Sequence, residues 1–174
     1  DTMKELFLAL STYNQKTNRI IYDLLKNISK NDFDRSLKCY YKNIGENIIH
    51  VIRSDIKWLQ RFSVFTITEQ DNKAFEIINK SKVISGETIV NNFVAFYDLR
   101  ITLDSKIIDF IKNIKEEEYL MKKQIAFGSQ NIELELWKLL LQWLNHQTHH
   151  RGQLSIQLEI IGIENDFSKI IDKI

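Results

Sequence analysis

Hydrophobic positions recur every three or four residues over most of the chain, which is the spacing of amphipathic helices. Four long segments carry this pattern, and we expect one long helix in each: residues 2–28, 43–62, 88–115 and 131–161. The third segment has the clearest pattern. The sequence has no proline and only five glycines, so few residues interrupt a helix. The pattern therefore predicts an all-α protein built as a four-helix bundle.

The connections between these segments differ in length. The periodicity fades from residue 63 to 87, where we expect a long crossover spanning the bundle, with a short helix over residues 72–79. A second connection runs from Asn31 to about Tyr41. Residues 119–127 are weakly strand-like and are followed by Gly128, so two short strands are allowed before the last helix. The predicted connectivity is up-down-down-up or a related order.

Several residues mark expected helix ends. Thr2 and Glu5 have the spacing of a capping box at the start of the first helix. Asn131 is a plausible N-cap for the fourth helix, and Gly162 supplies its stop. The acidic run at residues 116–118 is typical of a solvated helix end. After the last helix, we expect three apolar residues to fold back over the core: Phe167, Ile170 and Ile171.

Composition narrows the class of protein. At 174 residues the chain suits a single domain spanning residues 1–174, and its net charge of +1 lacks the basic excess typical of nucleic-acid binding. No apolar run reaches the length of a membrane helix, about 18 residues, and the N-terminus lacks a signal pattern. The single cysteine, Cys39, rules out an intrachain disulfide and fits a reducing compartment. We therefore expect a cytoplasmic protein without membrane or nucleic-acid partners.

Three of the four histidines lie within residues 143–154. In a helix, His146 and His150 are one turn apart on the inward face, whereas His149 points away and is not expected to be a ligand. A single inward histidine is ordinarily a hydrogen-bonded core residue, but two in an apolar groove need several partners, which one metal ion supplies. The pair lacks the glutamate of H-E-x-x-H, which argues against a zinc protease of that type.

Two longer patterns are more specific than the pair. Residues 145–154 read NHQTHHRGQL, and residues 50–59 read HVIRSDIKWL, with a histidine, an acidic residue five positions later and a tryptophan eight positions later. Together these closely resemble the DinB-like (YfiT-like) family of metal-binding four-helix bundles, and the resemblance covers nearly the whole chain. It implies that His50, His146 and His150 jointly bind one divalent metal ion at an open end of the bundle. On its own helix, His50 lies at the edge of the apolar stripe.

Neighbouring residues have expected supporting roles. Arg151 and Gln153 either orient the site from behind the ligands or make ordinary polar contacts, and Gly152 is expected to let a neighbouring helix approach. Asp55 either bonds a ligand imidazole or pairs with a base on the next helix. Trp58 and Trp143 are expected in the core rather than as a substrate platform. The leading candidates for the metal ion are zinc and nickel, and iron(II) and manganese are the next candidates.

Three functional hypotheses follow. The first is a metal-dependent enzyme that activates a thiol or a water, acting on a small molecule or using a low-molecular-weight thiol, as relatives of this fold do. The second is a non-catalytic metal-binding or stress-response scaffold, expected to be a homodimer through a bundle face. The third is a purely structural bundle without metal. The sequence shows no additional acid, base or nucleophile beside the three histidines that would decide between them.

Overall fold

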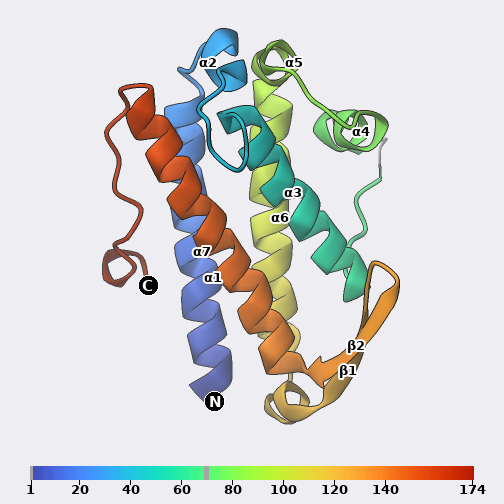
Figure 1. Cartoon of the computed structure of the whole chain (residues 1–174). Helices are drawn as coiled ribbons and strands as arrows, with labels where there is room; N and C mark the ends of the chain where they lie inside the picture. Colours follow the sequence, from blue (N-terminus) through green and yellow to red (C-terminus); the bar gives the residue numbers. More distant parts are fainter. Residues whose placement is uncertain (1, 69–70) are drawn as a thin grey trace.

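Four long helices form the body of the computed structural model, which describes residues 2–68 and 71–174 (Figure 1). They are α1 (Thr2–Leu25), α3 (Ile44–Arg61), α6 (Phe93–Asn113) and α7 (Leu136–Ile160). In the view of Figure 1, α1 and α7 run upward and α3 and α6 run downward, so the connectivity is up-down-down-up. The predicted all-α four-helix bundle with one long crossover is confirmed.

Shorter elements join the long helices. They are α2 (Lys30–Asp34), α4 (Lys73–Lys80), α5 (Gly86–Asn91), the 3-10 helices η1 (Glu116–Leu120) and η2 (Ile171–Lys173), and the strands β1 (Lys122–Phe127) and β2 (Gln130–Glu135). The short helix expected in the crossover is α4. β1 and β2 pair antiparallel with Ile125 opposite Ile132, which confirms the hairpin before the last helix.

Two of the four predicted long helices differ from the structure, one in where it begins and one in being divided in two. The last long helix begins at Leu136 rather than at Asn131, because residues 130–135 pair with β1 as an antiparallel strand, in which residues 131–134 alternate between exposed and partly buried positions. The helix predicted from residue 88 to 115 is divided at Asn92 into α5 and α6. The Asn92 side chain donates to the carbonyl of Thr88 at 2.8 Å, a local bond that competes with the regular helix pattern.

Three further expectations concern the connections and ends. Part of the loop predicted after the first helix is the short helix α2, capped by the Ser29 side chain, which accepts from the Asp32 amide. Phe167 is buried, as predicted, but Ile171 is 81% exposed and does not cover the core. The capping role of the Thr2 side chain lies outside the described part of the structure.

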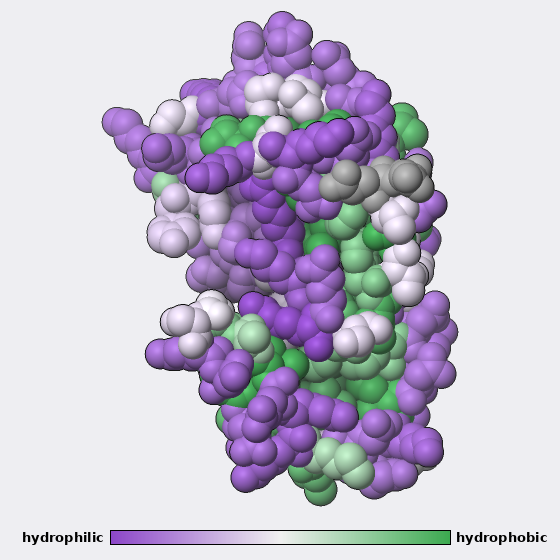
Figure 2. All heavy atoms as spheres, turned by 90° about the vertical axis from the view of Figure 1, so that its right-hand side faces the viewer, coloured by the Kyte–Doolittle hydropathy of each residue, from purple (hydrophilic) through white to green (hydrophobic). Residues whose placement is uncertain are grey.

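The core lies between the four long helices and is mainly aliphatic and aromatic. Trp58 of α3 and Trp143 of α7 stack with ring centroids 5.9 Å apart, and both are buried, which places them in the core as expected. Figure 2 shows that a strip of apolar atoms remains visible between hydrophilic regions on one side of the molecule. Within the described residues, no helix combines the length and apolar character that crossing a membrane requires.

Candidate metal centre

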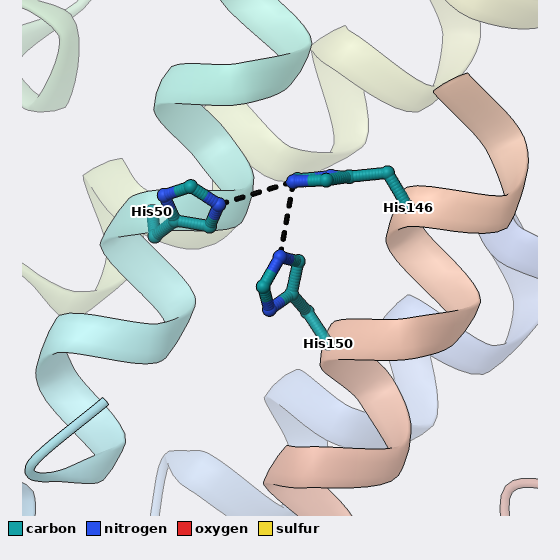
Figure 3. A group of neighbouring side chains, drawn as sticks. All are labelled: His50, His146 and His150. Carbon is teal, nitrogen blue, oxygen red and sulfur yellow. Dashed lines mark hydrogen bonds between the residues drawn. The ribbon is translucent and has the colours of Figure 1, made fainter. Parts of the chain in front are cut away.

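Three histidines from two helices converge between α3 and α7 (Figure 3). His50 lies on α3, and His146 and His150 lie one turn apart on α7. The Nε2 atom of His146 is 3.1 Å from Nε2 of His50 and 3.0 Å from Nε2 of His150. One ring nitrogen of each residue lies within 4.8 Å of the other two. His150 is buried, whereas His50 and His146 are partly exposed, so the group opens toward solvent on one side.

Gln153 fixes the protonation pattern of the buried histidine. Its side-chain nitrogen lies 3.2 Å from Nε2 of the exposed His149, and its side-chain oxygen lies 2.8 Å from Nδ1 of His150. The amide oxygen can only accept, so Nδ1 of His150 carries the proton and donates to it. The Nε2 atom of His150 then presents a lone pair to the centre of the group, which is the tautomer that a metal ligand requires.

All three imidazoles are neutral at physiological pH. Burial, and to a smaller extent the neighbouring His150, His146 and Lys57, lower the pKa of His50 to about 4. Burial also lowers the pKa of His150 to about 4, against an opposing effect of its bond to Gln153, and lowers the pKa of His146. Near pH 7 a metal ion therefore does not have to displace a second proton from any of the three rings.

The spacing of the three nitrogens fits a metal ion. Zinc–nitrogen bonds of about 2.0–2.1 Å in tetrahedral geometry place two ligand nitrogens about 3.3 Å apart. The two short separations here are 3.0 and 3.1 Å. A proton on Nε2 of His146 could satisfy one neighbouring lone pair well, whereas one cation satisfies all three nitrogens. The donor set is nitrogen only, which suits zinc and nickel better than the hard cations calcium and magnesium.

A buried polar network lies behind the histidines and connects the helices that carry them. Asp55 of α3 is fully buried, and it accepts from Trp143 Nε1 at 2.9 Å and Gln147 Nε2 at 2.9 Å, both on α7. Its other oxygen pairs with Arg100 of α6 at 2.7 Å. Of the two roles expected for Asp55, the described part of the structure shows the pairing with a base on another helix and no bond to a histidine.

Arg100 also binds a second buried carboxylate. Its Nη2 atom lies 2.8 Å from Asp104 on the next turn of α6, and Asn18 of α1 donates to the same carboxylate at 3.1 Å. Burial raises the pKa of Asp104 to about 6, although Arg100 opposes this shift. The network therefore includes at least one side chain from each long helix.

A second set of bonds holds the loop before α3 against α7. Asn47 donates to Gln157 Oε1 at 3.0 Å, and Gln157 donates to the carbonyl of Tyr41 at 2.9 Å. These bonds place the Tyr41 ring beside the site, with its centroid 4.7 Å from that of His50 and 5.3 Å from that of His150. Tyr41 therefore forms an aromatic wall next to two of the three histidines.

The remaining predicted site residues lie apart from the three histidines. Arg151 donates to Asn14 Oδ1 at 2.7 Å and lies over the Tyr13 ring, so it joins α7 to α1. Apart from the two chain neighbours and the nearby backbone of α7, a methyl group added at Gly152 would meet no atom of the described residues within 4 Å. The prediction that Gly152 allows a close helix approach is therefore wrong.

Sequence reasoning missed the groups behind and beside the site. Arg100 and Asp104 interrupt the apolar series of α6 four residues apart, and this placement of opposite charges on a buried face was the available signal. Gln147 gave a similar signal, since it lies on α7 between the buried Trp143 and Leu154. Tyr41 lies in a loop without periodicity, and no local pattern identifies it.

Comparison with known proteins agrees with this architecture. A family model described as the DinB family matches residues 3–166, a range that includes all three histidines. The chain is also similar to Protein DinB of Bacillus subtilis (strain 168), with 24% identity over 161 residues, covering 92% of this chain and 88% of that protein. The matched range contains the four long helices almost completely. The chain therefore belongs to the DinB family.

Proposed function

We propose that the chain binds one divalent metal ion through His50, His146 and His150 and is a metal-dependent enzyme that activates a thiol or a water. The observation that carries this proposal is the convergence of three neutral imidazoles, each with a ring nitrogen within 4.8 Å of the others. A core packed for stability alone would not bring three imidazole nitrogens together without donors to satisfy them.

Three protein ligands leave at least one coordination position of the metal ion free for a water or a substrate. A divalent ion held by three neutral ligands keeps its full charge, and it lowers the pKa of a water or thiol bound at a remaining position. The chain supplies an open side at the partly exposed His50 and His146, and Gln153 orients His150 from behind. Zinc and nickel are the leading ions for this site, with iron(II) or manganese behind them.

Activity assays on the metal-loaded protein test the enzymatic part. The protein is purified without a histidine tag, loaded with each metal, and assayed for thiol addition to an aromatic chloride and for hydrolysis of a nitrophenyl ester. We expect His146→Ala to lower the rate at least about tenfold, the scale of losses at metal sites. Glu159→Ala, at an exposed position of α7 away from the histidines, is the control and keeps the rate. Equal rates in the parent and His146→Ala would remove the enzymatic assignment.

One observation favours a non-catalytic alternative. Within the described residues, no carboxylate contacts the three histidines, because Asp55 is engaged by Arg100, Trp143 and Gln147. A metal-binding or stress-response scaffold needs no such group. This alternative predicts stoichiometric metal binding without acceleration of either assay reaction.

Assembly and location form the last part of the proposal. We propose a cytoplasmic homodimer formed through a bundle face, for which the apolar strip in Figure 2 offers surface. Cys39 is a free thiol, which is compatible with a reducing compartment. Sedimentation velocity distinguishes a particle of 20.7 kDa from one of twice that mass.

A further inference from the structure

A groove extends from His50, one of the three histidines, along α3. A hollow of about 240 Å³ opens beside His50 and is also lined by Tyr41 and Ile49. An adjoining hollow of about 400 Å³ lies toward α4, and the two share Arg53 and Lys82. We call the combined depression the α3–α4 groove. Its size suits a small molecule that reaches from the histidines toward α4.

Cationic residues of α3 lie on the same face as the histidine ligand. Arg53 and Lys57 follow His50 by three and seven residues, so the three side chains form one row along the helix. A rise of 1.5 Å per residue places Arg53 and Lys57 about 4.5 and 10 Å along the axis from His50. Both distances are within the length of a small organic molecule anchored at the histidines.

Among the described residues that line this groove, cations outnumber acids. Arg53 donates to the carbonyls of Ile78 at 3.0 Å and Lys82 at 2.9 Å, which are neutral acceptors. In the described ranges, Arg53, Lys57 and Lys82 form no ion pair with a carboxylate. Glu46 also lines the groove and accepts from the Lys42 amide, and its single negative charge offsets only part of the three positive charges.

The positive charge is local to this part of the molecule. The net charge of the whole chain is only +1, so three cations along one groove that pair with no carboxylate of residues 2–68 and 71–174 are not a reflection of overall composition. The histidines add no negative charge, and Asp55 behind them is paired with Arg100. A divalent ion at the site would raise the local positive charge further, and an anion is the ligand that compensates it.

We propose that the α3–α4 groove is the substrate site and binds a small organic anion. The reactive atom of this molecule lies at the histidine site, and its carboxylate or phosphate group lies along Arg53, Lys57 and Lys82. Tyr41 and Ile49 provide an apolar wall for its carbon skeleton. This inference rests on the proposed function and names the substrate class of that site.

A charge series of thiols on the cobalt(II)-loaded protein tests the proposal. The probes are 3-mercaptopropionate, 2-mercaptoethanol and cysteamine, which are similar in size and carry a negative, zero and positive charge. Binding releases the thiol proton to the buffer and changes the cobalt absorption, which gives each dissociation constant. Since the probes differ in thiol acidity, each constant is compared between parent and variant. We expect Lys57→Gln/Lys82→Gln to weaken 3-mercaptopropionate about three- to tenfold, to strengthen cysteamine, and to leave 2-mercaptoethanol within about twofold.

A control variant and two competitors complete the design. Lys16→Gln/Lys112→Gln removes the same charge from exposed positions on α1 and α6 and keeps all three constants. Acetate and methylphosphonate are then tested as competitors of 3-mercaptopropionate, and displacement by either supports the proposal and identifies the acid group. Unchanged constants in the groove variant, or no displacement by either competitor, overturn it. Failure of cobalt to bind overturns the proposed function as well, so the two failures are distinguishable.

Discussion

At the residue scale, Asp55 is the side chain with the most consequences for the site. It is fully buried and accepts from donors on two other helices, namely Arg100 on α6 and Trp143 and Gln147 on α7. It also lies five residues after His50 on α3. The bonds of Asp55 therefore set how α3 lies against α7, and with it the distance between His50 and the two histidines of α7.

Removing this carboxylate is expected to destabilise the fold strongly. In Asp55→Ala, three buried donors lose their acceptor and Arg100 keeps only Asp104 as a counter-charge. We expect a loss of about 3–5 kcal/mol in the free energy of unfolding, the usual cost of breaking a buried ion pair. Urea unfolding measures it. Asp98→Ala, at an exposed position of α6, is the matched control and changes stability by less than about 0.5 kcal/mol. A loss in Asp55→Ala no larger than the loss in Asp98→Ala would show that the buried network does not stabilise the fold.

The histidines make the metal-free protein sensitive to acid. Because the folded-state pKa values of His50 and His150 lie near 4, below the ordinary 6.5, the unfolded chain takes up protons that the folded chain does not. Their stabilising contribution is present above pH 6.5 and is lost as the pH falls toward 4. Asp104, with its raised pKa, contributes in the opposite direction.

Calorimetry with a chelator present isolates this effect. We expect the melting temperature of the parent to fall more between pH 7.5 and 4.5 than that of His50→Gln/His150→Gln, in which the two titrating groups are absent. The comparison cancels Asp104 and the exposed carboxylates, which both proteins share. Parallel pH profiles would contradict the assignment.

At the scale of the elements, periodicity predicted the long helices because each buries one apolar stripe. It failed where the same residues make hydrogen bonds that belong to a different local structure. Ile132 and Leu134 continue the apolar pattern of α7 backward, yet pairing with β1 makes them strand residues. Asn92 lies inside an apolar series, and its bond to the Thr88 carbonyl interrupts the helix. Local pattern does not contain these competing interactions.

Two glycines are expected to respond in opposite directions to replacement by alanine. A methyl group at Gly86 would lie 2.2 Å from the carbonyl oxygen of Lys30 and 2.8 Å from Cβ of Phe33, so α5 must move away from α2. We expect Gly86→Ala to cost about 1–3 kcal/mol. Gly152 lies on the open side of α7, and Gly152→Ala should stabilise by up to about 1 kcal/mol. Thermal unfolding of both variants checks the two signs, and a loss at Gly152 would contradict its open environment.

At the scale of the whole molecule, the site depends on segments almost one hundred residues apart. The helical spacing of His146 and His150 showed that they share a face, but no spacing relates them to His50 on another helix. The family resemblance supplied that third residue, and the fold places it 3.1 Å from His146. Arg100 was not recognised, since its role depends on a carboxylate from another helix.

Metal binding is expected to stabilise the whole fold, because the site joins α3 to α7. At free metal one hundred times the dissociation constant, stabilisation is about 2.7 kcal/mol, which corresponds to an increase of about 5–10 °C in melting temperature for a chain of this size. We expect zinc or nickel to produce this increase in the parent and in the control Glu159→Ala, but not in His146→Ala. An equal increase in His146→Ala would place the ion elsewhere.

Anomalous diffraction at the zinc absorption edge tests the three-histidine metal centre most directly. Crystals of tag-free protein grown with zinc are predicted to show one ion at about 2.0–2.1 Å from Nε2 of each of His50, His146 and His150. No anomalous peak at this position, or an ion whose ligands omit His50, would contradict the account.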